Sequence, residues 1–111
     1  MSDLLHKPCR PCAPGTPPLT RDRAADLIQQ ASGWSLNEAT TEIRREFKFK
    51  NYYETLAFVN AMAWVVHRED HHPDMEVSYN RVLVRFSTHS VKGLSENDFI
   101  CAAKINALMG G

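Results

Sequence analysis

The chain has 111 residues, enough for one domain with a modest buried core. Its 13 lysine and arginine residues balance 13 aspartate and glutamate residues, which excludes a generally basic surface of the kind that binds a nucleic-acid backbone. No stretch is apolar enough to span a membrane, and the first residues lack the apolar core of a signal peptide, so we expect a cytoplasmic protein.

Residues 1–19 are predicted to form an extended, mobile tail, because they contain five of the six prolines and show no hydrophobic period. Cys9 and Cys12 form a Cys-x-x-Cys pair within this tail. Three interpretations stay open: half of a zinc site completed by His6 or a second subunit, a redox pair, or two exposed reduced thiols. The absence of a second such pair favours the reduced thiols. Cys101 is the third cysteine, and three do not make a disulfide framework.

The domain is expected to begin with a helix that Thr20 caps, that runs to about Ala31 and that Gly33 stops. A short strand is expected at residues 34–36. Residues 42–49 alternate between apolar and charged side chains, which predicts a half-buried strand.

A second helix is expected from Tyr52 to about Arg68, with Asn51 as its N-cap. One apolar stripe along it consists of Tyr52, Leu56, Val59, Ala63 and Val66. Phe58, Met62 and Val65 cover a neighbouring face, and Trp64 lies on the other flank. Because few polar residues are left to face water, we expect this helix to pack under a sheet and also to contact another element or subunit.

Two alternating segments, residues 75–79 and 82–86, predict a β-hairpin with its turn at Asn80-Arg81. Ser95 is the expected cap of a last helix. The order helix, two strands, helix, two strands, helix predicts an α+β domain over residues 20–111. In this fold a four-stranded antiparallel sheet has three helices packed on one face, and oligomerisation is one way to protect the sheet edges.

Histidines are concentrated in one part of the chain. Four of the five lie there, namely His67, His71, His72 and His89. Imidazole exchanges protons near neutral pH and also binds metals, so two site chemistries are open. One is acid–base catalysis without metal, and the other is a metal held by His67 and His71 with His89 or Asp98 as third ligand. Asp98 also stands three residues after Ser95, where it could simply complete a capping pair.

The spacing of these residues resembles the signature of the pterin-4a-carbinolamine dehydratases. The pattern is His67-x-x-x-His71-His72-Pro73, followed by Tyr79, His89 and Asp98. The segments DHHPDM at 70–75, YNRV at 79–82, TH at 88–89 and KGLSENDF at 92–99 are also similar to that family. The resemblance covers roughly residues 19–108 and departs from the family at His67, where many members have an acidic residue.

The resemblance implies a hydro-lyase that removes water from 4a-hydroxytetrahydropterin and yields a quinonoid dihydropterin. That reaction belongs to the recycling of tetrahydrobiopterin after aromatic amino-acid hydroxylation, and links the protein to such a hydroxylase. The implied catalytic residues are His71 and His89 as acid and base and His72 as the residue that orients the pterin. Asp98 would position a histidine. His67 is also expected to be a supporting residue, but the role that an acidic residue has at this position in other members cannot be assigned to a histidine.

The resemblance also implies that no metal or cofactor takes part, and that the chain forms a dimer or a tetramer. The expected partners are the pterin substrate and a second copy of the chain, with no nucleic acid and no membrane. The alternative function is a non-catalytic module that stabilises a partner protein, which the small size, the apolar helix and the sheet edges would also fit.

Overall fold

A computed structural model describes residues 4–110 of the chain. Within this range the elements are η1 (Leu4–His6), α1 (Arg21–Ile28), β1 (Ser35–Leu36), β2 (Ile43–Lys48), α2 (Tyr52–Glu69), β3 (Asp74–Val77), β4 (Arg81–Phe86), η2 (His89–Val91) and α3 (Glu96–Leu108). The η elements are short 3₁₀ helices. None of the helices in these residues is both long and apolar enough to cross a bilayer.

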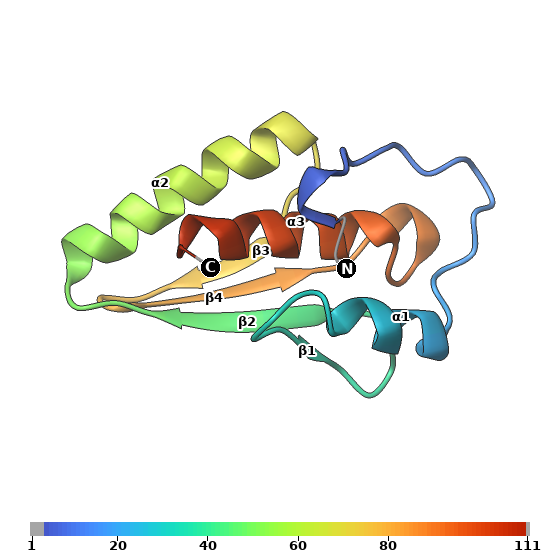
Figure 1. Ribbon diagram of the computed structural model, residues 1–111, viewed down its shortest axis with the longest axis horizontal. Helices are drawn as coiled ribbons and strands as arrows, with labels where there is room; N and C mark the ends of the chain where they lie inside the picture. The colour runs from blue at the N-terminus through green and yellow to red at the C-terminus, as the bar shows by residue number, and fades with distance from the viewer. Residues whose placement is uncertain (1–3, 111) are drawn as a thin grey trace.

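The four strands form one antiparallel sheet in the order β1-β2-β4-β3. β4 alternates as expected, with Val82, Val84 and Phe86 buried, and Phe86 pairs with Ile43 of β2. All three α-helices contribute to the core on this buried face, and Figure 1 shows α2 and α3 on the same side of the sheet. The predicted α+β fold, with three helices over one face of a four-stranded antiparallel sheet, is confirmed.

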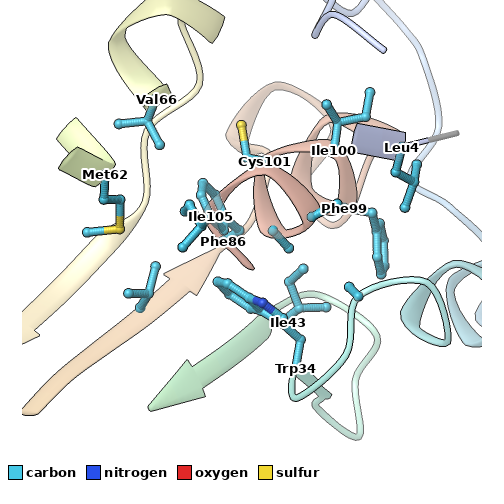
Figure 2. Packing of buried hydrophobic residues seen from close by; sticks show 14 of the residues in the cluster. Leu4, Trp34, Ile43, Met62, Val66, Phe86, Phe99, Ile100, Cys101 and Ile105 are labelled. Atoms are coloured by element: carbon cyan, nitrogen blue, oxygen red, sulfur yellow. The ribbon is translucent and has the colours of Figure 1, made fainter. Parts of the chain in front are cut away.

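Aromatic and aliphatic side chains of the sheet meet α3 at the centre of the core. Figure 2 shows Trp34 and Ile43 beside Phe99 and Ile105 of α3. The Trp34 indole Nε1–H donates a hydrogen bond of 2.9 Å to Asn106 Oδ1, so this buried donor has a partner. α3 therefore cannot shift relative to Trp34, which directly precedes β1, without breaking a specific polar contact as well as the packing.

The face of α2 that enters the core differs from the predicted stripe. Its buried residues are Thr55, Phe58, Met62 and Val66. Thr55 faces inward, where its hydroxyl lies 2.9 Å from the Tyr79 carbonyl and equally close to the Asn51 carbonyl of its own helix. Tyr52 and Trp64 are consequently left 49% and 66% exposed, so α2 retains an apolar outer face as expected.

The hairpin turn lies at Tyr79-Asn80, one residue before the predicted Asn80-Arg81. The Ser78 N–H donates to the Arg81 carbonyl at 2.9 Å, which closes the loop around Tyr79 and Asn80. Phe49 N–H donates to the Asn80 carbonyl at 2.8 Å. The start of α2 and the end of β2 therefore hold both turn carbonyls, a tertiary effect that turn propensities do not contain.

The N-terminal segment, predicted to be an extended tail, contains η1 and packs against α3. Leu4 is 2% exposed, and Figure 2 shows it beside Ile100. Lys104 Nζ donates to the Leu5 carbonyl at 2.8 Å. Farther along, Leu19 N–H donates to the Leu94 carbonyl at 2.8 Å, so both ends of the segment are attached to the domain.

Candidate active site

His71 is positioned by the way α2 ends. Asp70, the C-cap, adopts a left-handed conformation with φ 52°, which an aspartate tolerates better than most residues. The turn lets the His71 N–H donate back to the Val66 carbonyl at 3.2 Å. The His71 ring then lies parallel to the Phe86 ring, with 5.7 Å between centroids and 8° between planes. Backbone and ring are thus both fixed by contacts with the core.

Asp98 holds the same imidazole from the start of α3. Its carboxylate is completely buried, and Oδ1 lies 2.6 Å from His71 Nε2. Oδ2 accepts hydrogen bonds from the Ser95 N–H at 2.9 Å and the Thr88 hydroxyl at 2.8 Å. Asp98 therefore caps α3 through one oxygen and holds His71 through the other, so the two interpretations that the sequence left open both describe it.

The Asp98 contact determines which nitrogen of His71 remains for chemistry. A buried ionised carboxylate accepts but does not donate, so Nε2 carries the hydrogen in this pair. The lone pair of a neutral His71 is then on Nδ1. The side chain of His71 is 13% exposed, so the ring reaches solvent while its partner does not.

A hollow of about 470 Å³ opens beside His71. Its lining includes Arg10 and Cys12 from the N-terminal segment, Arg68 at the end of α2, and Ser90 of η2. These side chains are mostly polar, so the hollow suits a polar, hydrogen-bonding ligand better than an apolar one.

The four histidines do not line one common hollow. His67 and His72 are exposed and line a groove of about 550 Å³ between α2 and β3, together with Trp64 and Met75. His89 is exposed at the start of η2, in a third depression. Among residues 4–110 no hydrogen bond joins two of these imidazoles. The structure thus brings together His71 and Asp98, and places His89 one residue from Thr88, which lines the hollow of His71.

No three His, Cys, Asp or Glu side chains within residues 4–110 are grouped so that they could hold one metal ion. His67 and His71, the pair that the metal alternative requires, line different hollows. Of the Cys-x-x-Cys pair, Cys9 has its Sγ 3.6 Å from Cys101 Sγ in α3, and Cys9 and Cys12 both line the hollow beside His71. The hydrogen bond that the Cys101 thiol shares with Cys9, together with burial, raises the pKa of Cys101.

Sequence reasoning missed three contributors to this site. The sequence assigned no role to Phe86, whose ring stacks on His71, or to Thr88, whose hydroxyl donates to Asp98. The position of Thr88 directly before His89 was the one signal that could have found it. Arg10 was also missed, because a proline-rich segment without a hydrophobic period contains no local signal that it will dock beside α2.

Comparison with known proteins adds a family to this geometry. The family model for pterin 4 alpha carbinolamine dehydratase matches residues 17–108, which include the site and nearly the whole fold. The chain belongs to this family. The resemblance seen in the histidine spacing is thereby confirmed.

Relatives of the dehydratase family match over almost the full chain. A protein of Nitrosospira multiformis is 55% identical over 108 residues, covering 97% of this chain and 94% of its own. A protein of Stenotrophomonas maltophilia is 54% identical over 111 residues, covering 97% and 96%. Both carry the name pterin-4-alpha-carbinolamine dehydratase as a provisional assignment.

Two solved structures share the dehydratase fold. A transcriptional coactivator/pterin dehydratase from Brucella melitensis has a TM-score of 0.78 and 34% identity, covering 82% of this chain and 97% of its own. A pterin dehydratase-like protein described as a RuBisCO assembly factor of the α-carboxysome has a TM-score of 0.63 at 22% identity, covering 74% and 95%. The second likeness concerns the fold alone.

Proposed function

We propose that the protein dehydrates 4a-hydroxytetrahydropterins to quinonoid dihydropterins in the hollow beside His71. The observation that carries this proposal is the buried His71–Asp98 pair at 2.6 Å, in a chain that belongs to the dehydratase family. Dehydration requires a proton for the departing 4a hydroxyl and a base for the hydrogen on N5. Both transfers suit imidazole side chains, and neither requires a metal or a cofactor.

In this mechanism His71 is the base. With Nε2–H donated to Asp98, the Nδ1 lone pair accepts the N5 proton, and the carboxylate stabilises the imidazolium that forms. A carboxylate is the right partner for this step, because the positive charge on the ring strengthens their hydrogen bond. The stacked Phe86 ring and the Asp98 hydrogen bond limit rotation of the imidazole, so little motion is needed on proton transfer.

His89 is the proposed proton donor to the 4a hydroxyl. It begins η2, and its neighbours Thr88 and Ser90 both line the hollow of His71. A side chain on this turn can reach a substrate that His71 contacts, and its exposure keeps it in exchange with solvent protons. His72, the next residue after the base, lines the α2–β3 groove and not the hollow of His71, so we propose that it orients a part of the pterin that extends toward this groove, with His67 in support.

The test is the rate at which freshly generated 4a-hydroxytetrahydropterin loses water, followed by ultraviolet absorbance. The wild-type protein should accelerate the reaction and keep this activity after chelator treatment. The double variant His71→Ala, His89→Ala should lose it while keeping its circular dichroism spectrum, since each proton transfer contributes roughly 10²–10⁴-fold. His6→Ala is the matched control, because His6 is exposed on η1 and lines neither histidine hollow beside α2. An unchanged rate in the double variant would refute the proposal.

The quinonoid product is an oxidised pterin that a reductase can return to the tetrahydro form. The protein would therefore act after an aromatic amino-acid hydroxylase, which leaves its pterin as the 4a-hydroxy adduct. Coupled assays with a hydroxylase and limiting pterin test this link, and the predicted result is a higher steady rate in the presence of the protein.

We further propose that the chain forms a homodimer through its α2 and β3 side. Tyr52 stacks on Tyr79 there, with 6.0 Å between ring centroids, and both rings are about half exposed or more. Met75 and Val77 of β3 are also 42% and 45% exposed, on an edge strand whose outer backbone groups can accept a partner strand. Trp64→Glu should shift the protein to monomer in sedimentation velocity, whereas Arg44→Glu on the opposite, charged face of the sheet should not.

The same apolar surface is the observation that favours the second candidate function, a non-catalytic module that stabilises a partner protein. Recovery of a stoichiometric partner on the wild-type chain and not on Trp64→Glu, without turnover of the pterin adduct, would support this function over the dehydratase. Turnover by the purified protein alone would exclude it as the sole function.

A further inference from the structure

The N-terminal segment brings two thiols together next to the candidate active site. Cys9 Sγ lies 3.6 Å from Cys101 Sγ, although the two residues are 92 positions apart in the chain. Cys9 is half-buried and Cys101 is buried in α3. Figure 2 shows the Cys101 sulfur pointing away from Trp34 and Ile43. The thiol pair thus lies between the segment and the helix, not within the Cys-x-x-Cys sequence.

Hydrogen bonds on both sides of Cys9 hold its backbone in this position. The Cys9 N–H donates to Glu69 Oε1 at 2.8 Å, and the Arg10 N–H donates to Asn97 Oδ1 at 3.0 Å. Asn97 Nδ2 donates in return to the Arg10 carbonyl at 2.7 Å. Together with the buried Leu4 these contacts hold Cys9 beside Cys101, so the two sulfurs already lie 3.6 Å apart in the folded domain.

The two thiols differ in solvent accessibility, as a stepwise thiol–disulfide exchange requires. Cys9 lines the hollow beside His71, where a small molecule can reach it, whereas Cys101 is shielded by the helix and the segment. The thiolate is the attacking species in exchange reactions, and an accessible sulfur reacts before a buried one. A reagent would thus meet Cys9 first, and Cys101 would act second.

We propose that Cys9 and Cys101 form a reversible disulfide, a redox modification site that a low-molecular-weight disulfide such as oxidised glutathione can oxidise. The Cys9 thiolate attacks one sulfur of the small disulfide, whose S–S bond breaks and releases one thiolate. The Cys101 thiol then attacks the Cys9 sulfur, and its proton passes to the second small thiolate, which departs as a thiol. One disulfide bond is broken and one is formed, and the protein loses two hydrogens to the two small thiols.

The bond would fasten the N-terminal segment across the hollow of the candidate base. Cys101 Sγ lies 3.9 Å from the His71 carbonyl, and Cys9, Cys12 and His71 line the same hollow. In the dithiol form non-covalent contacts hold the segment, among them the Lys7–Glu96 ion pair and the buried Leu4, whereas the disulfide would tie it covalently to α3. The site stands on the geometry of the thiols alone, whereas its effect on turnover rests on the proposed function.

The test is a redox titration of the full-length protein in glutathione buffers of increasing oxidised fraction, quenched with an alkylating reagent and analysed by peptide mass spectrometry. The expected product is a linked pair of peptides containing Cys9 and Cys101, with Cys12 alkylated. Cys12→Ser should keep the link and Cys9→Ser should remove it. Cys9 is the residue to change first, because it is half-buried and its replacement leaves the core intact.

A second readout is the thermal midpoint of the oxidised and reduced forms. Closing so long a loop should raise it by about 10 °C or more in the wild type and in Cys12→Ser, and not in Cys9→Ser. The proposal would be overturned by a Cys9–Cys12 disulfide, by disulfides formed only between two chains, or by thiols that stay free in fully oxidised glutathione. Stoichiometric zinc that protects the cysteines from alkylation would also overturn it. Absence of dehydratase activity in both redox forms would refute the proposed function and leave a mapped Cys9–Cys101 disulfide standing.

Discussion

Replacing Asp98 with asparagine should reverse the tautomer of His71. The substitution keeps the shape of the side chain and turns one of its two oxygens into an NH₂ group. Near Oδ2 the Ser95 N–H is a donor at 2.9 Å, and a backbone N–H cannot accept, so the amide oxygen must stay on that side. The new NH₂ group therefore faces His71 Nε2, where the carboxylate oxygen lay at 2.6 Å.

His71 Nε2 must then become the acceptor, and its hydrogen moves to Nδ1. The lone pair that we assign to the catalytic base is lost, so the dehydration rate should fall roughly 10²–10⁴-fold. Two charge-assisted hydrogen bonds to a buried carboxylate become neutral ones, which should lower the free energy of unfolding by about 1–3 kcal/mol. A domain of this size tolerates such a loss and remains folded.

The assay combines the dehydration rate with the ¹⁵N chemical shifts of the His71 ring, which report the tautomer directly. Glu96→Gln is the matched control: it also removes an acid from the first turn of α3, but its carboxylate pairs with Lys7 at 3.0 Å and does not contact His71. The control should keep both rate and tautomer. If Asp98→Asn works at the wild-type rate although Nδ1 is protonated, the assignment of Nδ1 as the base is refuted. If the tautomer of His71 is unchanged in this variant, the hydrogen-bond reasoning itself is refuted.

Two stability predictions follow from the core. Asn106→Ala should lower the free energy of unfolding in urea by about 2–4 kcal/mol, because it leaves the buried indole N–H of Trp34 without a partner and opens a cavity; a loss below half a kcal/mol would contradict this. Gly33→Ala should destabilise more than Gly15→Ala: both glycines have φ above 80°, but a Cβ at position 33 would lie 2.8 Å from Arg45 Nε, whereas position 15 is open. Equal thermal midpoints of the two variants would contradict the clash.

Local chemistry was enough to predict most elements of the fold from sequence. The caps Thr20 and Asn51 accept hydrogen bonds from the backbone three residues later, as expected for helix starts. The alternation in residues 42–49 and 82–86 identified the central strands and their buried faces, because the side-chain period of a strand is fixed by its backbone. Arg45 lies between the buried residues Ile43 and Phe47 of β2, and local sequence does not explain a charged side chain there. The structure explains it by a tertiary contact, because the Arg45 guanidinium donates to Asn106 Oδ1 at 2.6 Å.

The histidine spacing was likewise sufficient to place the chain in its family, because a long motif with fixed intervals is specific. Spacing along the chain cannot say which side chains meet. Only the tertiary structure separates His72 and His67 in the α2–β3 groove from His71 in its own hollow. Only the approach of α3 to the end of α2 brings the Asp98 carboxylate to that imidazole.

The buried face of α2 and the docking of the N-terminal segment were decided by contacts between parts of the chain far apart in sequence. α2 is apolar over most of its surface, so periodicity alone left two faces eligible, and the structure buries the face with Thr55, Phe58 and Met62. The segment before residue 19 has no periodic signal, and Leu4 becomes a core residue only because α3 offers it a surface. The sequence by itself determined the elements, their order and the family; the tertiary structure decided which faces, imidazoles and thiols come together, because these depend on packing across the domain.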